Sequence, residues 1–163
     1  MPANRKILDA RLAELGIRTT TVEHEPVFTV EESVSLRESI PGAHTKNLFL
    51  VDPDGRMVLV TAKDDTRVDL KALAKRLGFG RFSFGKAPLL EAVLGVSPGS
   101  VTPLALMNES AAGIAVVIDR TLLDSAEVNC HPLENTATIR FATADLIRFI
   151  KECGHDPLIV PLS

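Results

Sequence analysis

The sequence predicts a single α/β domain in which a mixed, strongly curved sheet is flanked by helices. The chain has the length of one domain, 163 residues, and its 45% hydrophobic and 24% charged residues are typical of a globular protein. Helical and strand patterns alternate without a linker, a repeat or a low-complexity segment. Short turns join several of the expected strands, as in antiparallel pairs. We therefore expect one domain over residues 1–163.

Apolar residues at helical spacing predict five helices, most of them with a recognisable start or stop signal. They cover residues 4–15, 30–39, 69–77, 88–94 and 143–152. Thr29 and Glu32 have the spacing of a capping box at the start of the second helix. Gly78 is expected to close the third helix, and Thr143 to cap the last.

Runs of β-branched and apolar residues between turn signals predict eight strands. They cover residues 17–22, 45–51, 57–62, 82–84, 104–107, 114–119, 127–129 and 136–141. The run 45–51 is apolar on both faces, and the turn sequence Asp52-Pro53-Asp54-Gly55 follows it. We expect these two features to form a central hairpin with residues 57–62.

The segment 94–106 carries two glycines and two prolines within nine residues. Proline fixes φ and glycine permits positive φ, so this segment is predicted to be a rigid, shaped turn. The backbone amides of Ser100, Val101 and Thr102 have no evident helix or ladder to join. Such amides suit an oxyanion or a ribose hydroxyl. A helix C-terminus followed by an ordinary turn explains the same residues.

Six cations lie within twenty residues of a chain whose net charge is −3. They are Arg67, Lys71, Lys75, Arg76, Arg81 and Lys86. The net charge argues against a protein that binds nucleic acid over its whole surface, but it permits a local basic patch. The absence of Trp and Tyr, with only seven Phe, argues against an extended platform for stacking bases. The basic segment is either a solvated helix face or a contact for a phosphate backbone.

Two side chains are candidates for chemistry. Lys46 begins a strand and shares its face with Leu48 and Leu50, so it is either an edge residue that extends its amine to solvent or a cation aimed into a cleft. His131 precedes Pro132, which imposes an extended conformation and gives the imidazole a defined direction. A lone histidine is also commonly structural, so both interpretations stay open.

Several classes of site are disfavoured. The chain has no Walker sequence, no G-x-G-x-x-G after a strand and no G-x-S-x-G elbow. Cys130 and Cys153 do not form a disulfide framework, and Cys130 and His131 would point to opposite faces of a strand, so they could hardly hold one metal ion. We expect no metal and no cofactor. No apolar run approaches the ~20 residues of a membrane span, and the N-terminus lacks a signal-peptide core, so a cytoplasmic protein without membrane partners is expected.

Three separated motifs resemble the YbaK/prolyl-tRNA-synthetase-associated editing-domain family. They are Thr45-Lys46-Asn47-Leu48-Phe49-Leu50, Gly99-Ser100-Val101-Thr102-Pro103 and Asn129-Cys130-His131-Pro132-Leu133-Glu134-Asn135-Thr136-Ala137-Thr138. Within that family the sequence is most similar to the free-standing Ala-tRNA(Pro) deacylases. The resemblance implies a barrel-like sheet and hydrolysis of the ester that joins a wrong amino acid, alanine, to tRNA(Pro). It also implies that the partner is the acceptor end of tRNA(Pro), with prolyl-tRNA synthetase as a candidate docking partner.

The resemblance also implies roles for particular residues. Lys46 matches the family's lysine, placed to hold the terminal adenosine's phosphate or the ester region. Gly99, Ser100 and Val101 belong to the family's G-x-x-x-P loop, whose amides would bind the ester carbonyl or the ribose, and His131 lines the same pocket. Substrate contacts are implied at Asn47, Thr102, Pro103, Arg81, Lys71 and Lys75.

Rival functions remain open at this point. A deacylase for Cys-tRNA(Pro) or for another small residue would need the same motifs, since the preference depends on the volume of the pocket. A non-catalytic module that binds tRNA or a synthetase, or a generic small-molecule-binding domain, would keep the fold without turnover. Phe49, Met107 and Cys130 are candidate walls of the side-chain pocket, although packing in the core explains each of them equally well.

Overall fold

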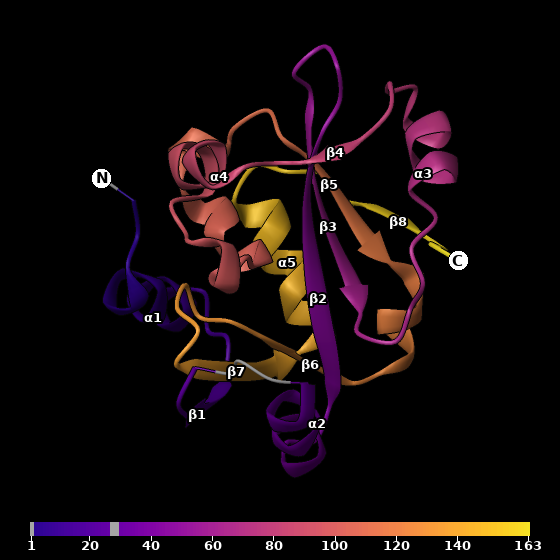
Figure 1. Ribbon diagram of the computed structural model, residues 1–163. Coiled ribbons are helices and arrows are strands. Elements are labelled where there is room, and N and C mark those ends of the chain that lie inside the picture. Colours follow the sequence, from indigo (N-terminus) through magenta and orange to yellow (C-terminus); the bar gives the residue numbers. More distant parts are fainter. Residues whose placement is uncertain (1, 27–29) are drawn as a thin grey trace.

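The computed structural model describes residues 2–26 and 30–163 (Figure 1). Its helices are α1 Arg5–Glu14, α2 Val30–Ser39, α3 Leu70–Leu77, α4 Ala87–Leu94 and α5 Thr143–Glu152. Its strands are β1 Thr19–Glu23, β2 Ala43–Val51, β3 Met57–Lys63, β4 Ser83–Phe84, β5 Ala115–Asp119, β6 Glu127–Cys130, β7 Ala137–Ala142 and β8 Leu158–Val160. Short 3-10 helices span Pro98–Ser100, Pro103–Met107, Glu109–Ala111 and Arg120–Asp124. No helix of the described ranges is long and apolar enough to cross a membrane.

The eight strands form one mixed sheet in the order β1-β7-β6-β2-β3-β5-β8, with β4 paired to β2. The long β2 joins two parts of this sheet. It pairs with β3 in antiparallel fashion from Thr45 to Val51, with β6 in parallel fashion at its start, and with β4 at its end. Figure 1 shows β6 and β7 crossing below β2 and β3, with α5 in the space between them. The predicted fold class, a mixed curved sheet flanked by helices, is confirmed.

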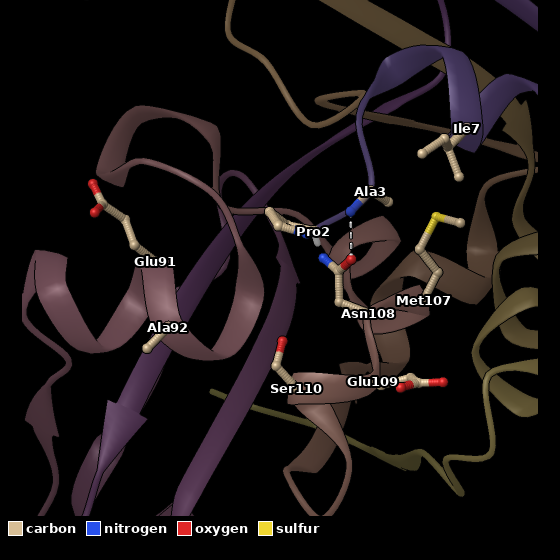
Figure 2. Close-up of a pocket in the computed structure, with 9 residues that line it drawn as sticks. All are labelled: Pro2, Ala3, Ile7, Glu91, Ala92, Met107, Asn108, Glu109 and Ser110. Atoms are coloured by element: carbon tan, nitrogen blue, oxygen red, sulfur yellow. Dashed lines mark hydrogen bonds between the residues drawn. The ribbon is translucent and has the colours of Figure 1, made fainter.

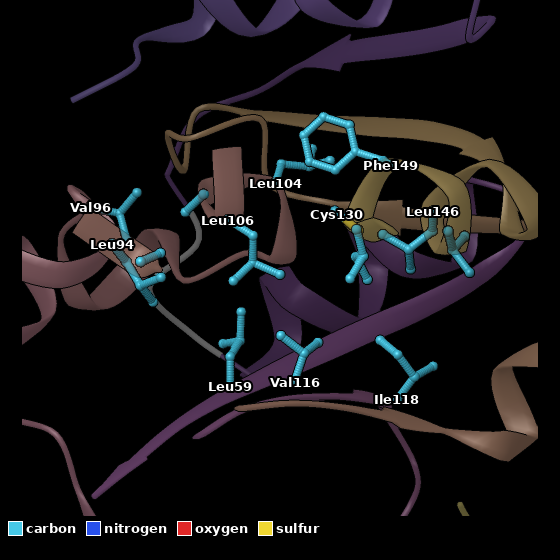
Figure 3. Packing of buried hydrophobic residues seen from close by; sticks show 14 of the residues in the cluster. Leu59, Leu94, Val96, Leu104, Leu106, Val116, Ile118, Cys130, Leu146 and Phe149 are labelled. Atoms are coloured by element: carbon cyan, nitrogen blue, oxygen red, sulfur yellow. The ribbon is translucent and has the colours of Figure 1, made fainter. Parts of the chain in front are cut away.

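Alternation along β2 separates two hydrophobic cores. Phe49 packs into the larger core, while its neighbour Leu50 packs into a smaller one. The larger core lies between the strands on one side and helices α4 and α5 with the 3-10 helices on the other. Figure 3 shows Leu59 and Val116 opposite Leu146 and Phe149 in this core. The smaller core lies under α3, which contributes Leu73. The two faces of β2 therefore meet different surroundings.

The segment 104–107 corrects one sequence prediction. It was expected to be a strand, but it belongs to the 3-10 helix Pro103–Met107. Thr102 starts this helix, because its Oγ1 accepts a hydrogen bond from the Leu104 amide at 3.3 Å. Leu104, Ala105 and Leu106 are all at most 1% exposed. An apolar run that is buried on every side has no periodicity that distinguishes a strand from a helix.

Two further expectations at element ends have definite outcomes. Thr143 does not cap α5: Ala142 holds the N-cap position, and the Thr143 hydroxyl donates to the Ser125 carbonyl at 2.6 Å. Gly78 does close α3, in the left-handed conformation, as predicted. The capping box expected from Thr29 lies outside the described residues. Strand β8 was not predicted from the sequence.

Candidate active site

The middle of β2 has an open edge. On the side away from β3, β6 pairs only with Ala43 and His44, and β4 pairs only with Leu50 and Val51. The Asp64 amide donates to the His44 carbonyl, so the even-numbered residues direct their backbone groups at β3. Asn47 therefore directs its backbone amide and carbonyl at the open edge, where no described strand pairs with it. Such an edge can bind an extended polar partner.

Lys46 lies on this strand with an unpartnered charge. The side chain is half-buried, and its ammonium group has no hydrogen bond or ion pair with any residue that the structure describes. The parallel register pairs His44 with Asn129. This pairing ends at His44 and Asn129, so Lys46 and His131 each lie two positions beyond the last pair of the two strands. Lys46 continues β2, whereas His131 follows the end of β6.

The imidazole of His131 is held neutral. Burial lowers its pKa from the ordinary 6.5, and the nearby His24 adds to this effect, while the Ala137 carbonyl opposes it. Nδ1 of His131 lies 3.4 Å from that carbonyl. When Nδ1 carries the proton and donates to the carbonyl, Nε2 is left as an acceptor. At neutral pH this ring can therefore orient or accept a proton, but it supplies no fixed positive charge.

A cavity of about 530 Å³ opens between His24 and α2, and Glu31 and Ser35 line it from the helix. Nε2 of His24 lies 2.9 Å from the hydroxyl of Thr138, which belongs to β7, the neighbour of β6. His131 is not among the residues that line this cavity.

The segment 97–103 is the rigid turn that the sequence predicts, with one correction. The Ser100 amide, expected to be free, donates to the Ser97 carbonyl at 2.9 Å, because Pro98–Ser100 forms a 3-10 turn. The amides of Val101 and Thr102 donate to no acceptor in the described part of the chain. Thr102 is fully buried, so only the Val101 amide, on a half-buried residue, remains available to a ligand.

This turn meets the segment that follows His131. Gly99 is exposed, and a Cβ atom added to it would lie 3.2 Å from Nδ2 of Asn135. Glycine is therefore favoured here by a close approach between two segments that are far apart in the sequence. Thr102 and Pro103 are buried residues, so the structure does not present the substrate contacts that the resemblance implies for them.

Asn47 is not brought together with Lys46. Adjacent residues of a strand point to opposite faces, and Oδ1 of Asn47 accepts a hydrogen bond from the Thr61 hydroxyl at 2.6 Å. Its side chain therefore lies on the face of the larger core. Its backbone at the open edge is the part that can reach a ligand.

The structure offers no activated nucleophile at Cys130. Burial raises the pKa of this thiol to about 12, because the charged thiolate is disfavoured in an apolar site. Cys130 and Phe49 are 4% exposed and belong to the larger core, against which Met107 packs. Among residues 2–26 and 30–163, no group of three His, Cys, Asp or Glu gathers at metal-binding distance.

The predicted cations lie on and after α3. Lys71, Lys75 and Arg81 are exposed, and they form no ion pair with the described residues. Helix α3 packs on the smaller core, on the β2 face that also carries Lys46. The basic patch and the free ammonium group of Lys46 are therefore on one side of the sheet.

An N-terminal arm, which sequence reasoning did not identify, supports both segments of the site. The guanidinium of Arg5 forms ion pairs with Glu23 of β1 and, at 2.9 Å, with Glu134 in the segment after His131. These pairs raise the pKa of Arg5 above its ordinary value. Arg5 and Glu134 are 129 positions apart, so no local pattern could reveal their contact.

The second anchor of this arm is Asn108. Its Oδ1 accepts from the Ala3 amide at 2.7 Å, and its Nδ2 donates to the Leu94 carbonyl at 2.9 Å. Figure 2 shows Pro2, Ala3 and Asn108 together beside a cavity of about 610 Å³. A Cβ on Gly95 would lie only 2.6 Å from the Pro2 side chain. The arm thus packs against both ends of the segment that contains the rigid turn.

Comparisons with known proteins agree with the motifs. The model of the family described as "Aminoacyl-tRNA editing domain" matches residues 24–149. A prolyl-tRNA synthetase associated domain-containing protein 1 from Danio rerio is 40% identical over 158 residues, which cover 96% of this chain and 86% of the relative. The prolyl-tRNA editing protein ProX of Acetoanaerobium sticklandii is 35% identical over 156 residues, which cover 95% and 94%.

A solved structure has the same fold. This crystal structure, named as that of a "putative trans-editing enzyme for prolyl tRNA synthetase", superposes with a TM-score of 0.73 at 19% identity, covering 98% of this chain and 96% of that one. At this identity the likeness concerns the fold alone. With a family model that spans most of its length and relatives of this similarity, the chain belongs to the aminoacyl-tRNA editing domain family.

Proposed function

We propose that the protein is a trans-editing hydrolase that cleaves the ester between tRNA(Pro) and a wrongly attached small amino acid, with alanine as the preferred one. One observation carries this proposal: the unpartnered ammonium group of Lys46 lies on β2 just beyond its last pair with β6, and His131, whose pKa is lowered by burial, follows the end of β6. The names of the relatives support the choice of prolyl-tRNA as the substrate class.

The reaction needs no protein nucleophile, because an aminoacyl ester is already activated. A water molecule adds to the ester carbonyl carbon, and the bond to the ribose oxygen then breaks. That oxygen takes a proton, so the products are the free amino acid and intact tRNA. The amide of Val101 would stabilise the developing oxyanion, where one such donor contributes a factor of about 10²–10³ in rate.

Lys46 and His131 have separate tasks in this scheme. The Lys46 ammonium group would hold the terminal phosphate or the ester region, which positions the carbonyl for attack. Nε2 of His131 would orient the water. The ribose hydroxyl next to the ester would assist the water, so its replacement by hydrogen is expected to slow hydrolysis sharply. An unchanged rate would remove this assistance from the mechanism.

A separate editing site solves a problem that binding alone cannot solve. A synthetase pocket built for proline rejects a smaller side chain weakly, since one missing methylene group changes the binding free energy by only about 1–3 kcal/mol. A second pocket that admits alanine and excludes proline by its volume supplies the missing discrimination.

The decisive experiment incubates the purified protein with tRNA(Pro) charged separately with alanine, cysteine or proline and follows the loss of the ester. We expect rapid loss of alanine and stable proline. Preferred loss of cysteine would assign the alternative substrate. Binding of tRNA without any ester loss would show a non-catalytic module and contradict the proposal.

A further inference from the structure

Phe84 presents an aromatic ring to solvent. Its exposed fraction is 63%, larger than that of any other large hydrophobic side chain in the described residues, the next being Ile7 at 49%. Phe82, two positions earlier, packs against the smaller core. The Phe84 ring, on a strand of only two residues, is therefore open to contact with a partner, and its neighbourhood decides which partner it suits.

The pairing of β4 with β2 fixes where this ring lies. Phe84 is directly opposite Leu50, and antiparallel partners share a face. Lys46 and Leu48 are on that same face, because they precede Leu50 by four and two residues. At about 3.3 Å per residue, Phe84 lies on the order of 13 Å along the sheet from Lys46. A continuous row thus connects the ammonium group to the ring.

The strand that carries Phe84 is held firmly against β2. The Gly85 amide donates to the Phe49 carbonyl at 2.9 Å. A Cβ atom on Gly85 would lie 2.3 Å from the Phe49 ring, so only glycine permits this approach. The ring of Phe84 is therefore placed at the end of the open β2 edge by backbone contacts, whether or not a ligand is present.

The charges near this ring identify the kind of partner. Arg81 and Lys86 flank Phe84 in the sequence, both are exposed, and neither forms an ion pair with the described residues. An aromatic face beside unpaired cations suits a single-stranded nucleic acid, in which a base stacks on the ring while phosphates contact the cations.

We infer that Phe84 is the stacking platform for an unpaired base in the single-stranded 3′ tail of the tRNA, while the ester at the end of that tail is held near Lys46. At ~3.4 Å per stacked nucleotide, the distance of about 13 Å corresponds to three or four nucleotides. This inference rests on the proposed function and adds to it a site of RNA recognition away from the reacting atoms.

The test compares Phe84→Leu, which keeps an apolar side chain without a π face, with Phe84→Trp, which keeps a face for stacking. With charged tRNA(Pro), we expect Phe84→Leu to raise KM about 10-fold with little change in kcat, and Phe84→Trp to stay near the wild type. Leu123→Ala is the matched control, because Leu123 is 46% exposed on a different element, Arg120–Asp124, and should leave KM unchanged.

A second arm identifies the base. Bases of the single-stranded tail are replaced one at a time by abasic nucleotides, and KM is measured for wild type and Phe84→Leu. We expect one abasic position to raise KM for the wild type and to have no further effect in Phe84→Leu.

The outcomes separate the two proposals. If the wild type hydrolyses the ester and Phe84→Leu has an unchanged KM, the stacking inference is wrong and the proposed function stands. If every abasic position raises KM by the same factor in Phe84→Leu as in the wild type, the stacking inference is also wrong. If the wild type neither binds nor hydrolyses charged tRNA(Pro), the proposed function itself fails.

Discussion

Lys46 and Asn47 are neighbours with opposite surroundings. The lysine side chain lies on the face of α3, while the asparagine side chain is hydrogen-bonded to Thr61 on the other face. The motif that contains both residues could be found in the sequence, and the alternation of a strand predicts their separation. The pairing of His44 with Asn129, after which Lys46 and His131 follow, joins residues 85 positions apart, so it could not be predicted from local patterns.

Replacement of Lys46 tests the central charge. We expect Lys46→Ala to reduce kcat/KM for Ala-tRNA(Pro) at least about 10²-fold, because a positioning contact with the substrate is lost. The side chain is half-buried without a partner in the described chain, so the midpoint of urea unfolding should barely move. Lys46→Arg serves as a control for charge. Near-normal turnover by Lys46→Ala would show that the lysine is a structural edge residue.

The lowered pKa of His131 predicts a particular pH dependence. Because burial disfavours the charged ring, the neutral form persists below pH 6.5, and kcat/KM should fall only at lower pH. His131→Gln should lower kcat/KM about 10²-fold and abolish this acid limb. Measurement of kcat/KM from pH 5 to 8 for the wild type and for His131→Gln checks this expectation. An acid limb that is unchanged in His131→Gln would assign it to another group.

The lowered pKa of His131 also makes the free energy of unfolding depend on pH. The direction of this dependence serves as a control for the rate measurements. The folded protein binds a proton at His131 less readily than the unfolded chain does, so the free energy of unfolding should decrease as the pH falls below about 6.5. Urea unfolding at each pH therefore accompanies the rates. Only pH values at which the protein remains folded enter the comparison.

At the scale of elements, the site depends on two connecting segments that the N-terminal arm supports. The turn 97–103 approaches the segment after His131 at Gly99 and Asn135, and Arg5 is paired with Glu134 in that segment. Proline and glycine positions identified the rigid turn from the sequence. The arm carries no such signal, since every contact that anchors it spans a long stretch of chain.

Removal of the Arg5 charge should therefore affect activity more than stability. Arg5→Met loses two ion pairs with solvent-exposed glutamates, and such pairs contribute little to the free energy of unfolding. We expect kcat to fall several-fold, because the segment after His131 loses its anchor. Arg11→Met on the same helix loses only the pair with Glu14 and should keep its kcat. Equal kcat values for both variants would contradict a positioning role.

Element boundaries show where sequence reasoning reaches its limit. The five helices and most strands were found, because apolar spacing and turn residues are local signals. The failures at 104–107 and Thr143 have a common origin. In both places a tertiary contact replaces the local preference. Residues 104–106 are buried on all sides, and the Thr143 hydroxyl donates a hydrogen bond to the Ser125 carbonyl.

At the scale of the whole molecule, charge is distributed unevenly over an acidic protein. The chain has a net charge of −3, yet α3 and the segment after it expose cations on the side of Lys46. Composition alone predicted this patch. Its position relative to the site required the packing of α3 on the smaller core, which is a long-range property of the fold.

The patch predicts how tRNA binding depends on salt. If Lys71 and Lys75 contact phosphates, the double variant Lys71→Ala/Lys75→Ala should reduce the slope of log K against log[salt] by about 1.5, since each phosphate contact contributes roughly 0.7–0.9. Binding of uncharged tRNA(Pro) is measured by fluorescence anisotropy at several salt concentrations. Lys6→Ala/Lys151→Ala removes two exposed cations elsewhere and should leave the slope intact. An equal change in both double variants would show that the attraction is not confined to α3.

The alternating faces of β2 also restrict which length changes the chain can tolerate. A single-residue deletion between His44 and Leu50 would exchange the two faces for every later position of the strand, so the side chains that pack in the larger core would face the smaller one and the reverse. The hairpin tip at Asp54 and Gly55 is free of this restriction, because its side chains contact no core. Homologous chains should therefore vary in length at that tip while keeping the spacing between the lysine and the strand's end.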